Sequence, residues 1–156
     1  MKYAHHYDSP LGRITAVSDG ECLTRLYFDD SPASSAASPN IALFDALDRW
    51  LDAYFGGTIP DFMPPLSLRS TPFQLAVWDA IRAVPYGSTA TYGEIAARLG
   101  KPGCARAVGA AVARNPIAIL IPCHRIVGAG GALTGYAWGI ERKRWLLEWE
   151  RGRGHA

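Results

Sequence analysis

Cys123 and His124 are the residues of this chain whose types and spacing fit nucleophilic chemistry. Cys123 follows Pro122 at the end of an apolar run, and His124 and Arg125 come next. A thiolate forms at neutral pH where positive charge or an acid–base partner lies nearby, and His124 is placed to be that base, directly or through a water. Spacing alone leaves a second interpretation open, in which Cys123 is a buried structural cysteine beside a core histidine.

The other cysteines do not suggest a metal site or a disulfide framework. The chain has three cysteines, at positions 22, 104 and 123, and no pair is spaced as CxxC. Cys22 together with His5 or His6 offers too few ligands for a tetrahedral zinc ion. We therefore expect free thiols, no metal and no cofactor.

Short strands and one helix are predicted for the N-terminal half. Turn residues separate segments 13–17 and 22–28, which predicts an antiparallel hairpin. Residues 31–40 are small and polar and predict a loop. Apolar residues at spacings of three and four predict a helix over 41–55. The proline-rich segment 58–70 is expected to connect the two halves.

The C-terminal half is predicted to be mostly helical. Helices are expected at 72–84, 91–99, 103–114 and 141–150, a strand at 117–121 and a glycine-rich loop at 128–135. The helices at 91–99 and 103–114 are joined by a Gly/Pro turn, which makes them a helix-turn-helix candidate.

Charge is divided unevenly between the halves. Residues 1–69 contain five basic and nine acidic residues, whereas residues 70–156 contain eleven basic and five acidic residues. The basic half could attract a polyanion such as DNA, or its charges could simply be a solvated surface. No apolar run reaches the roughly 18 residues of a membrane span, and the polar N-terminus does not resemble a secretory signal. We expect a cytoplasmic protein with no membrane contact.

Several ordered motifs of the C-terminal half resemble the O6-alkylguanine-DNA alkyltransferases, also called methylated-DNA–protein-cysteine methyltransferases. The motif around Cys123 resembles the family's active-site signature, and the resemblance extends from Thr71 to Glu150. The matching segments are 115–117, 121–125, 91–96, 105–109, 135–136 and 145–150. The N-terminal half is only loosely similar.

The resemblance implies an α/β protein of two domains. A small antiparallel sheet-plus-helix domain of ribonuclease H-like type is expected at 1–65. A mostly helical, winged-helix-like domain with the helix-turn-helix is expected at 70–156. The implied activity is direct reversal of DNA damage: an alkyl group moves irreversibly from O6-alkylguanine, and from O4-alkylthymine, to the protein's own cysteine. The implied partner is double-stranded DNA, bound by a monomer through the minor groove with the damaged base flipped out.

Five residues match the family's catalytic positions. Cys123 is the implied alkyl acceptor, and its thioether product is a poor leaving group, so each molecule acts once. His124 resembles the general base and Glu150 the carboxylate that orients it. Tyr92 resembles the phenol that gives a proton to the departing purine. Asn115 resembles the asparagine that holds the active-site turn, although a simple turn before Pro116 is the alternative.

Arg106 matches the arginine that fills the space left by the flipped base. A solvated arginine or a phosphate contact is its alternative interpretation. Small side chains would let the helix press into a groove. The remaining implied DNA-binding residues are Thr91, Tyr92, Ala105, Ala107, Ala110, Arg114 and Arg125, with a structural role as the second possibility for Arg125.

The substrate pocket is expected to include Ile126, Tyr136, Ala137 and Trp138. Family members often have Ser and Gly where this chain has Ala137 and Trp138. A hydroxyl that could bond O6 is therefore missing, although the backbone N–H of Ala137 could replace it. Trp138 is expected to narrow the pocket and to disfavour bulky adducts.

Three other functions compete with this interpretation. An alkyltransferase-like protein that only binds lesions would lack the acceptor cysteine. A helix-turn-helix regulator would explain 91–114 but not the Cys–His turn. A cysteine hydrolase would need an oxyanion hole and multiple turnovers.

Overall fold

Three strands near the N-terminus form an antiparallel sheet. The computed structural model describes residues 2–31 and 39–152. Strands β1 (Tyr3–Ser9), β2 (Gly12–Ser18) and β3 (Leu23–Phe28) follow one another in the order β1-β2-β3. The predicted hairpin corresponds to β2 and β3, so it is confirmed, and β1 adds a strand to it.

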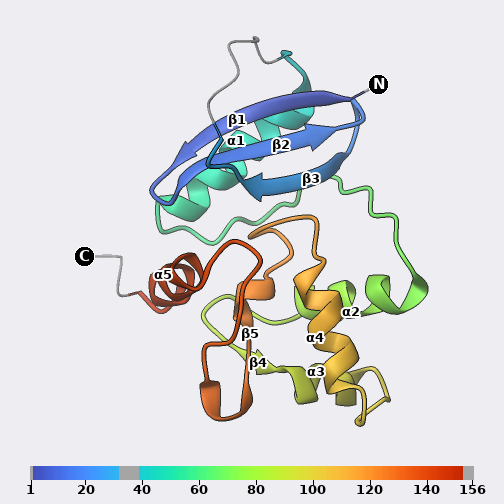
Figure 1. The fold of residues 1–156 in the computed structure, drawn as a ribbon. Coiled ribbons are helices and arrows are strands. Elements are labelled where there is room, and N and C mark those ends of the chain that lie inside the picture. The colour runs from blue at the N-terminus through green and yellow to red at the C-terminus, as the bar shows by residue number, and fades with distance from the viewer. Residues whose placement is uncertain (1, 32–38, 153–156) are drawn as a thin grey trace. The chain divides into compact units, whose positions relative to one another are not determined.

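Helix α1 (Ala42–Phe55) lies across one face of this sheet (Figure 1). Its apolar stripe is buried, as the spacing predicted. Polar residues of β1 are bonded to the helix: His5 Nε2 lies 2.9 Å from Asp48, and Tyr7 donates to Asp52 at 2.6 Å. Strand β1 is formed by its antiparallel pairing with β2, and these side-chain bonds satisfy its polar residues beside the helix. The predicted loop at 31–40 falls largely outside the described residues.

The chain divides into two units, residues 1–68 and 69–156, and the second is mostly helical. Helix α2 (Pro72–Arg82) begins with Thr71 as its N-cap and proline in its first turn. Helices α3 (Tyr92–Arg98) and α4 (Ala105–Ala113) pack on each other and on α2. A buried hydrogen bond of 2.9 Å from Trp78 Nε1 to the carbonyl of Ala111 ties α2 to α4. The predicted pair of helices at 91–114 is confirmed.

Thr91 begins α3 with a capping box. Its hydroxyl accepts from the Glu94 N–H, and the Glu94 carboxylate accepts from the Thr91 N–H. These bonds satisfy donors that a helix end leaves unpaired. They place Tyr92 as the first residue of the helix.

The segments after α4 are short and lead to the last helix. A 3₁₀ turn, η1 (Cys123–Arg125), is followed by β5 (Ile126–Val127), which pairs in parallel with β4 (Ala90–Thr91). A second 3₁₀ turn, η2 (Ala129–Gly131), lies in the glycine-rich loop, and α5 (Ile140–Glu150) follows. No helix within 2–31 and 39–152 is both long and apolar enough to cross a membrane.

The strand predicted at 117–121 is wrong. Residues 118–120 form turns, and Ile119 adopts a positive φ of 67°. A β-branched residue rarely adopts this conformation, so the surrounding structure must hold it. Residues 117–121 are apolar because all of them are buried, and burial here does not require an extended strand.

Candidate active site

Asn115 fixes the turn that presents Cys123. Its side-chain oxygen accepts from the Ile117 N–H at 2.9 Å, and its amide nitrogen donates to the Ile121 carbonyl at 2.9 Å. The same nitrogen donates to Cys123 Sγ at 3.1 Å. An amide has two N–H donors and one oxygen, and all of them are used here. These bonds close the turn and aim one N–H at the sulfur.

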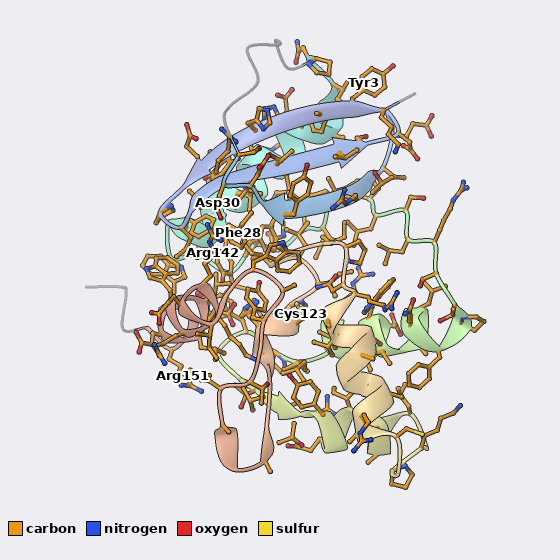
Figure 2. All side chains as sticks on the ribbon, in the orientation of Figure 1. Tyr3, Phe28, Asp30, Cys123, Arg142 and Arg151 are labelled. Carbon is orange, nitrogen blue, oxygen red and sulfur yellow. The ribbon has the colours of Figure 1, made fainter. Side chains whose placement is uncertain are left out.

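Cys123 begins η1, in the segment that follows α4 (Figure 2), and is 1% exposed. Burial raises the pKa of its thiol to about 11, while the Asn115 N–H and the charge of Lys143 act in the opposite direction. Desolvation disfavours a thiolate. The sulfur therefore needs a base to remove its proton, and it needs nearby donors that stabilise the anion.

Glu150 is the centre of a buried ionic cluster. Its Oε2 lies 2.6 Å from His124 Nε2, and its Oε1 accepts from Arg125 Nε at 2.7 Å. Arg125 Nη2 also donates to Oε2 at 3.0 Å, and Nη1 donates to the Val84 carbonyl at 2.8 Å. The cluster joins the end of α5 to η1 and to the residues after α2.

The cluster sets the protonation of His124. Burial acts to raise the pKa of Glu150, but His124 and Arg125 outweigh it and hold that pKa well below its usual range. Burial lowers the pKa of His124, although Glu150 opposes this shift. An ionised carboxylate only accepts, so His124 Nε2 carries the hydrogen and Nδ1 has a lone pair. Among the described residues Nδ1 has no hydrogen-bond partner, which leaves it able to take a proton.

A cavity of about 390 Å³ opens beside the sulfur. Its size is within the range of small-molecule sites. Its lining residues come from α3, α4, η1 and the loop before α5: Tyr92, Gly109, Val112, Ala113, Cys123, Gly135, Tyr136 and Ala137. The Cys123 thiol and the Tyr92 phenol therefore lie in the same cavity.

Two predicted pocket residues lie outside this lining. Ile126 is buried in β5, and the ring of Trp138 stands edge-on to Tyr136 with centroids 5.2 Å apart. Trp138 can therefore influence the cavity through the position of Tyr136. The other two, Tyr136 and Ala137, do line it.

Helix α4 presents small and basic residues to solvent. Arg106, Ala107, Ala110 and Arg114 are exposed, and Ala105 is half-buried. Thr91 uses its hydroxyl as a helix cap. The guanidinium of Arg125 is committed to Glu150 and Val84, which supports the structural interpretation of Arg125 over a phosphate contact.

Sequence reasoning missed Lys143 and Thr134. Lys143 is 1% exposed, and its Nζ donates to the Ile126 carbonyl at 2.7 Å. Thr134 Oγ1 lies 2.6 Å from the Tyr92 hydroxyl. The signal for Lys143 was present, because it shares the buried face of α5 with Leu146, Leu147 and Glu150 at helical spacing.

Both units match known protein families. The family described as "6-O-methylguanine DNA methyltransferase, DNA binding domain" matches residues 72–152. The family described as "6-O-methylguanine DNA methyltransferase, ribonuclease-like domain" matches residues 2–68. Together these matches span most of the chain.

Individual relatives agree with the family matches. The methylated-DNA--protein-cysteine methyltransferase of Mycobacterium tuberculosis is 47% identical over 157 residues, covering 97% of this chain and 95% of that protein. The protein of the same name from Haemophilus influenzae is 41% identical and covers 96% and 86%. A crystal structure of Mycobacterium tuberculosis OGT in complex with DNA has a TM-score of 0.86 and 47% identity, covering 96% of this chain and 93% of that chain.

The Glu150 cluster predicts a stability that depends on pH. Glu150→Gln should lower the free energy of unfolding at pH 7 by about 3 kcal/mol, because one partner of a buried ion pair is lost. The folded pKa of Glu150 is depressed, so its contribution is present above the ordinary value of 4.5 and is lost as pH falls below it. Urea unfolding at pH 7 and at lower pH measures both effects.

The difference in the free energy of unfolding between wild type and Glu150→Gln should become smaller as the pH falls below about 4.5. Glu148→Gln is the matched control, since Glu148 is exposed on the same helix. An equal difference at every pH would contradict the assigned charge on Glu150.

Proposed function

The chain belongs to the 6-O-methylguanine DNA methyltransferase family, and we propose that it repairs O6-alkylguanine in DNA by taking the alkyl group onto its own Cys123. The observation that carries the assignment to Cys123 is its place in a cavity shared with Tyr92, with His124 as its sequence neighbour. Transfer from O4-alkylthymine stays a prediction.

The reaction starts with removal of the thiol proton. His124 Nδ1 takes that proton, directly or through a water, while Glu150 stabilises the imidazolium that forms. The Asn115 N–H and the charge of Lys143 stabilise the thiolate. A thiolate is the nucleophilic form of cysteine.

Transfer is a displacement at the alkyl carbon. A bond forms between Sγ and that carbon as the carbon–O6 bond breaks, and the bonding pair remains on the purine. Tyr92 gives a proton to the purine and so neutralises the charge that develops there. The product is a thioether at Cys123, a poor leaving group, so the protein is used once.

DNA is bound by the helix-turn-helix of α3 and α4. We place α4 in the minor groove, where its exposed alanines allow close approach. The target base must leave the stack to reach a cavity within the protein, which costs a few kcal/mol. Arg106, exposed on α4, fills the space that the base leaves. We further propose that one copy of the chain is sufficient.

Replacing the acceptor tests the proposed function. Wild-type protein incubated with excess O6-methylguanine duplex should gain one CH₂ on the peptide that contains Cys123, with at most one transfer per molecule. Cys123→Ser should bind the duplex and gain nothing, because a hydroxyl is a far weaker nucleophile. Peptide mass spectrometry measures the transfer.

Cys22→Ser is the control and should react like wild type. Repeated turnovers, or methylation at Cys22 or Cys104 instead, would rule out this mechanism.

The general-base role of His124 has a separate test. His124→Ala should slow single-turnover transfer on the order of 10²–10⁴-fold, the usual contribution of a general base, with the Kd for duplex DNA nearly unchanged. The difference in transfer rate between His124→Ala and wild type should become smaller as pH rises toward about 11, because hydroxide then ionises the buried thiol without a protein base. A variant that is slow to the same extent at every pH would indicate a structural loss instead.

Arg106 is tested by comparing substrates. Arg106→Ala should slow repair of duplex DNA much more than repair of single-stranded DNA, in which no stacked space needs filling. The control, Arg82→Ala, removes one exposed charge from α2 and should slow neither. A phosphate contact predicts equal losses on both substrates and a salt slope reduced by about one; that result would reject the proposed role.

A further inference from the structure

Ile119 lies in a strained turn of the segment that leads to Cys123. Within residues 2–31 and 39–152 it is the only residue other than glycine with a positive φ, at 67°. The Leu120 N–H donates to the Ala118 carbonyl at 2.7 Å, so these three residues form a γ-turn centred on Ile119. This hand of the γ-turn is rare, and a β-branched residue adopts it only where the surrounding structure enforces it.

The Ile119 side chain supplies that enforcement. It is 1% exposed and is among the largest fully buried side chains of the described residues. The other residues of the run 117–121 are buried as well. Rotation of the Ile119 backbone to a negative φ would move this side chain out of its place in the core, and the loss of apolar burial opposes that rotation. Packing therefore holds the turn against the conformational preference of its central residue.

A second turn of the same size comes directly before the sulfur. The Cys123 N–H donates to the Ile121 carbonyl at 2.8 Å around Pro122, whose φ of −82° and ψ of 62° belong to the common, relaxed hand. Fully extended, residues 115–123 would span roughly 26–29 Å. Because the two turns fold this segment back, the Asn115 amide nitrogen lies 2.9 Å from the Ile121 oxygen and 3.1 Å from Cys123 Sγ.

We infer that Ile119 is a positioning residue, whose buried side chain holds a left-handed turn and thereby keeps the Asn115 N–H on Cys123 Sγ. The inference rests on the proposed function, since the sulfur that is positioned is the proposed alkyl acceptor. Ile119 does not line the cavity beside the sulfur, so it acts through Asn115 and not on the substrate.

The consequence for Cys123 is electrostatic. Burial raises the pKa of the thiol to about 11, and the Asn115 bond acts against that rise. A turn that relaxes moves this donor away from the sulfur, so the pKa rises further. Each added unit lowers the thiolate fraction at pH 7 about tenfold, and the rate of transfer falls with it. The charge of Lys143 also favours the thiolate, but it comes from α5 and does not depend on the turn.

Alanine and glycine at position 119 separate the two contributions of this residue. Both remove the buried anchor, but glycine adopts a positive φ without the steric cost, which is about tenfold in population for an L-residue. Ile119→Ala should slow single-turnover repair of an O6-methylguanine duplex on the order of tenfold. Ile119→Gly should recover most of that loss, although it leaves the larger cavity.

Ala118→Gly is the matched control. It removes the same methyl group from the neighbouring buried residue, whose φ is not positive. Glycine loses more conformational freedom on folding, so this change should lower the unfolding temperature and should not speed repair. Ile119→Val removes only one carbon of the anchor, and it should shift the thiol pKa in the same direction as Ile119→Ala, by less. Thermal unfolding verifies that each variant is folded.

Methyl iodide measures the sulfur without DNA. The thiolate attacks the methyl carbon and iodide leaves with the bonding pair, so the rate follows the thiolate fraction. At pH 7 Ile119→Ala should react more slowly than wild type, and the two rates should approach each other as the pH passes about 11. General loosening of the fold predicts the opposite, because an exposed thiol has a pKa near its ordinary 9.0 and reacts faster. Mass spectrometry of the Cys123 peptide measures the reaction.

The contrary results are distinct. Faster reaction of Ile119→Ala with methyl iodide would overturn the inference, as would repair that is slower in Ile119→Gly than in Ile119→Ala. An unchanged rate with methyl iodide in every variant of Ile119 that folds would overturn it too. Wild-type protein that reacts with methyl iodide but not with the duplex would overturn the proposed function instead, and the order of the variants with methyl iodide would still decide what Ile119 does at the sulfur.

Discussion

The buried carboxylate of Glu150 is the interaction on which the second unit depends. One side chain accepts hydrogen bonds from His124 and Arg125, and Arg125 extends the connection to the Val84 carbonyl. The last helix, the turn that contains Cys123 and the segment after α2 are thereby held by a single anion. Burying that anion is tolerable only because its partners are charged or polar and well placed. The same bonds fix which nitrogen of His124 has the lone pair, so structural support and proton chemistry are not separable here.

Periodicity and capping signals predicted much of the fold. The spacing of apolar residues located α1, and a threonine before a proline located the start of α2. The failures have physical causes. Segment 117–121 has the composition of a buried strand, but the Asn115 side chain occupies the backbone groups that a strand would pair. Strand β1 pairs with its neighbour β2 and lies within the segment predicted to form short strands, but its polar side chains His5 and Tyr7 bond residues far along the chain, on α1. Bonds between distant residues leave no trace in local sequence patterns.

The candidate site was predicted better than its surroundings. The sequence singled out Cys123 because a proline, a histidine and an arginine adjoin it, and the family motif supplied Tyr92, Asn115 and Glu150. It could not show that Arg125 is committed to Glu150, nor that Thr134 touches Tyr92 across 42 positions. Trp138 was expected in the pocket from its place in the sequence, whereas its ring stands against Tyr136. Residue type suggests a chemistry, but only the fold shows which groups share a hydrogen.

The exposed alanines of α4 have a consequence for how information is divided in the proposed repair. Methyl groups cannot donate or accept hydrogen bonds, so they read little of the pattern on base edges, and the minor groove offers only a degenerate pattern in any case. With α4 in the minor groove, as proposed, contact through Ala107 and Ala110 therefore distinguishes little between base sequences. The proposed mechanism then assigns recognition of the lesion to a later step, in which a single base enters the cavity. In the proposed mechanism, DNA binding and lesion recognition are thus two successive steps on separate surfaces, and the first step favours no particular base sequence.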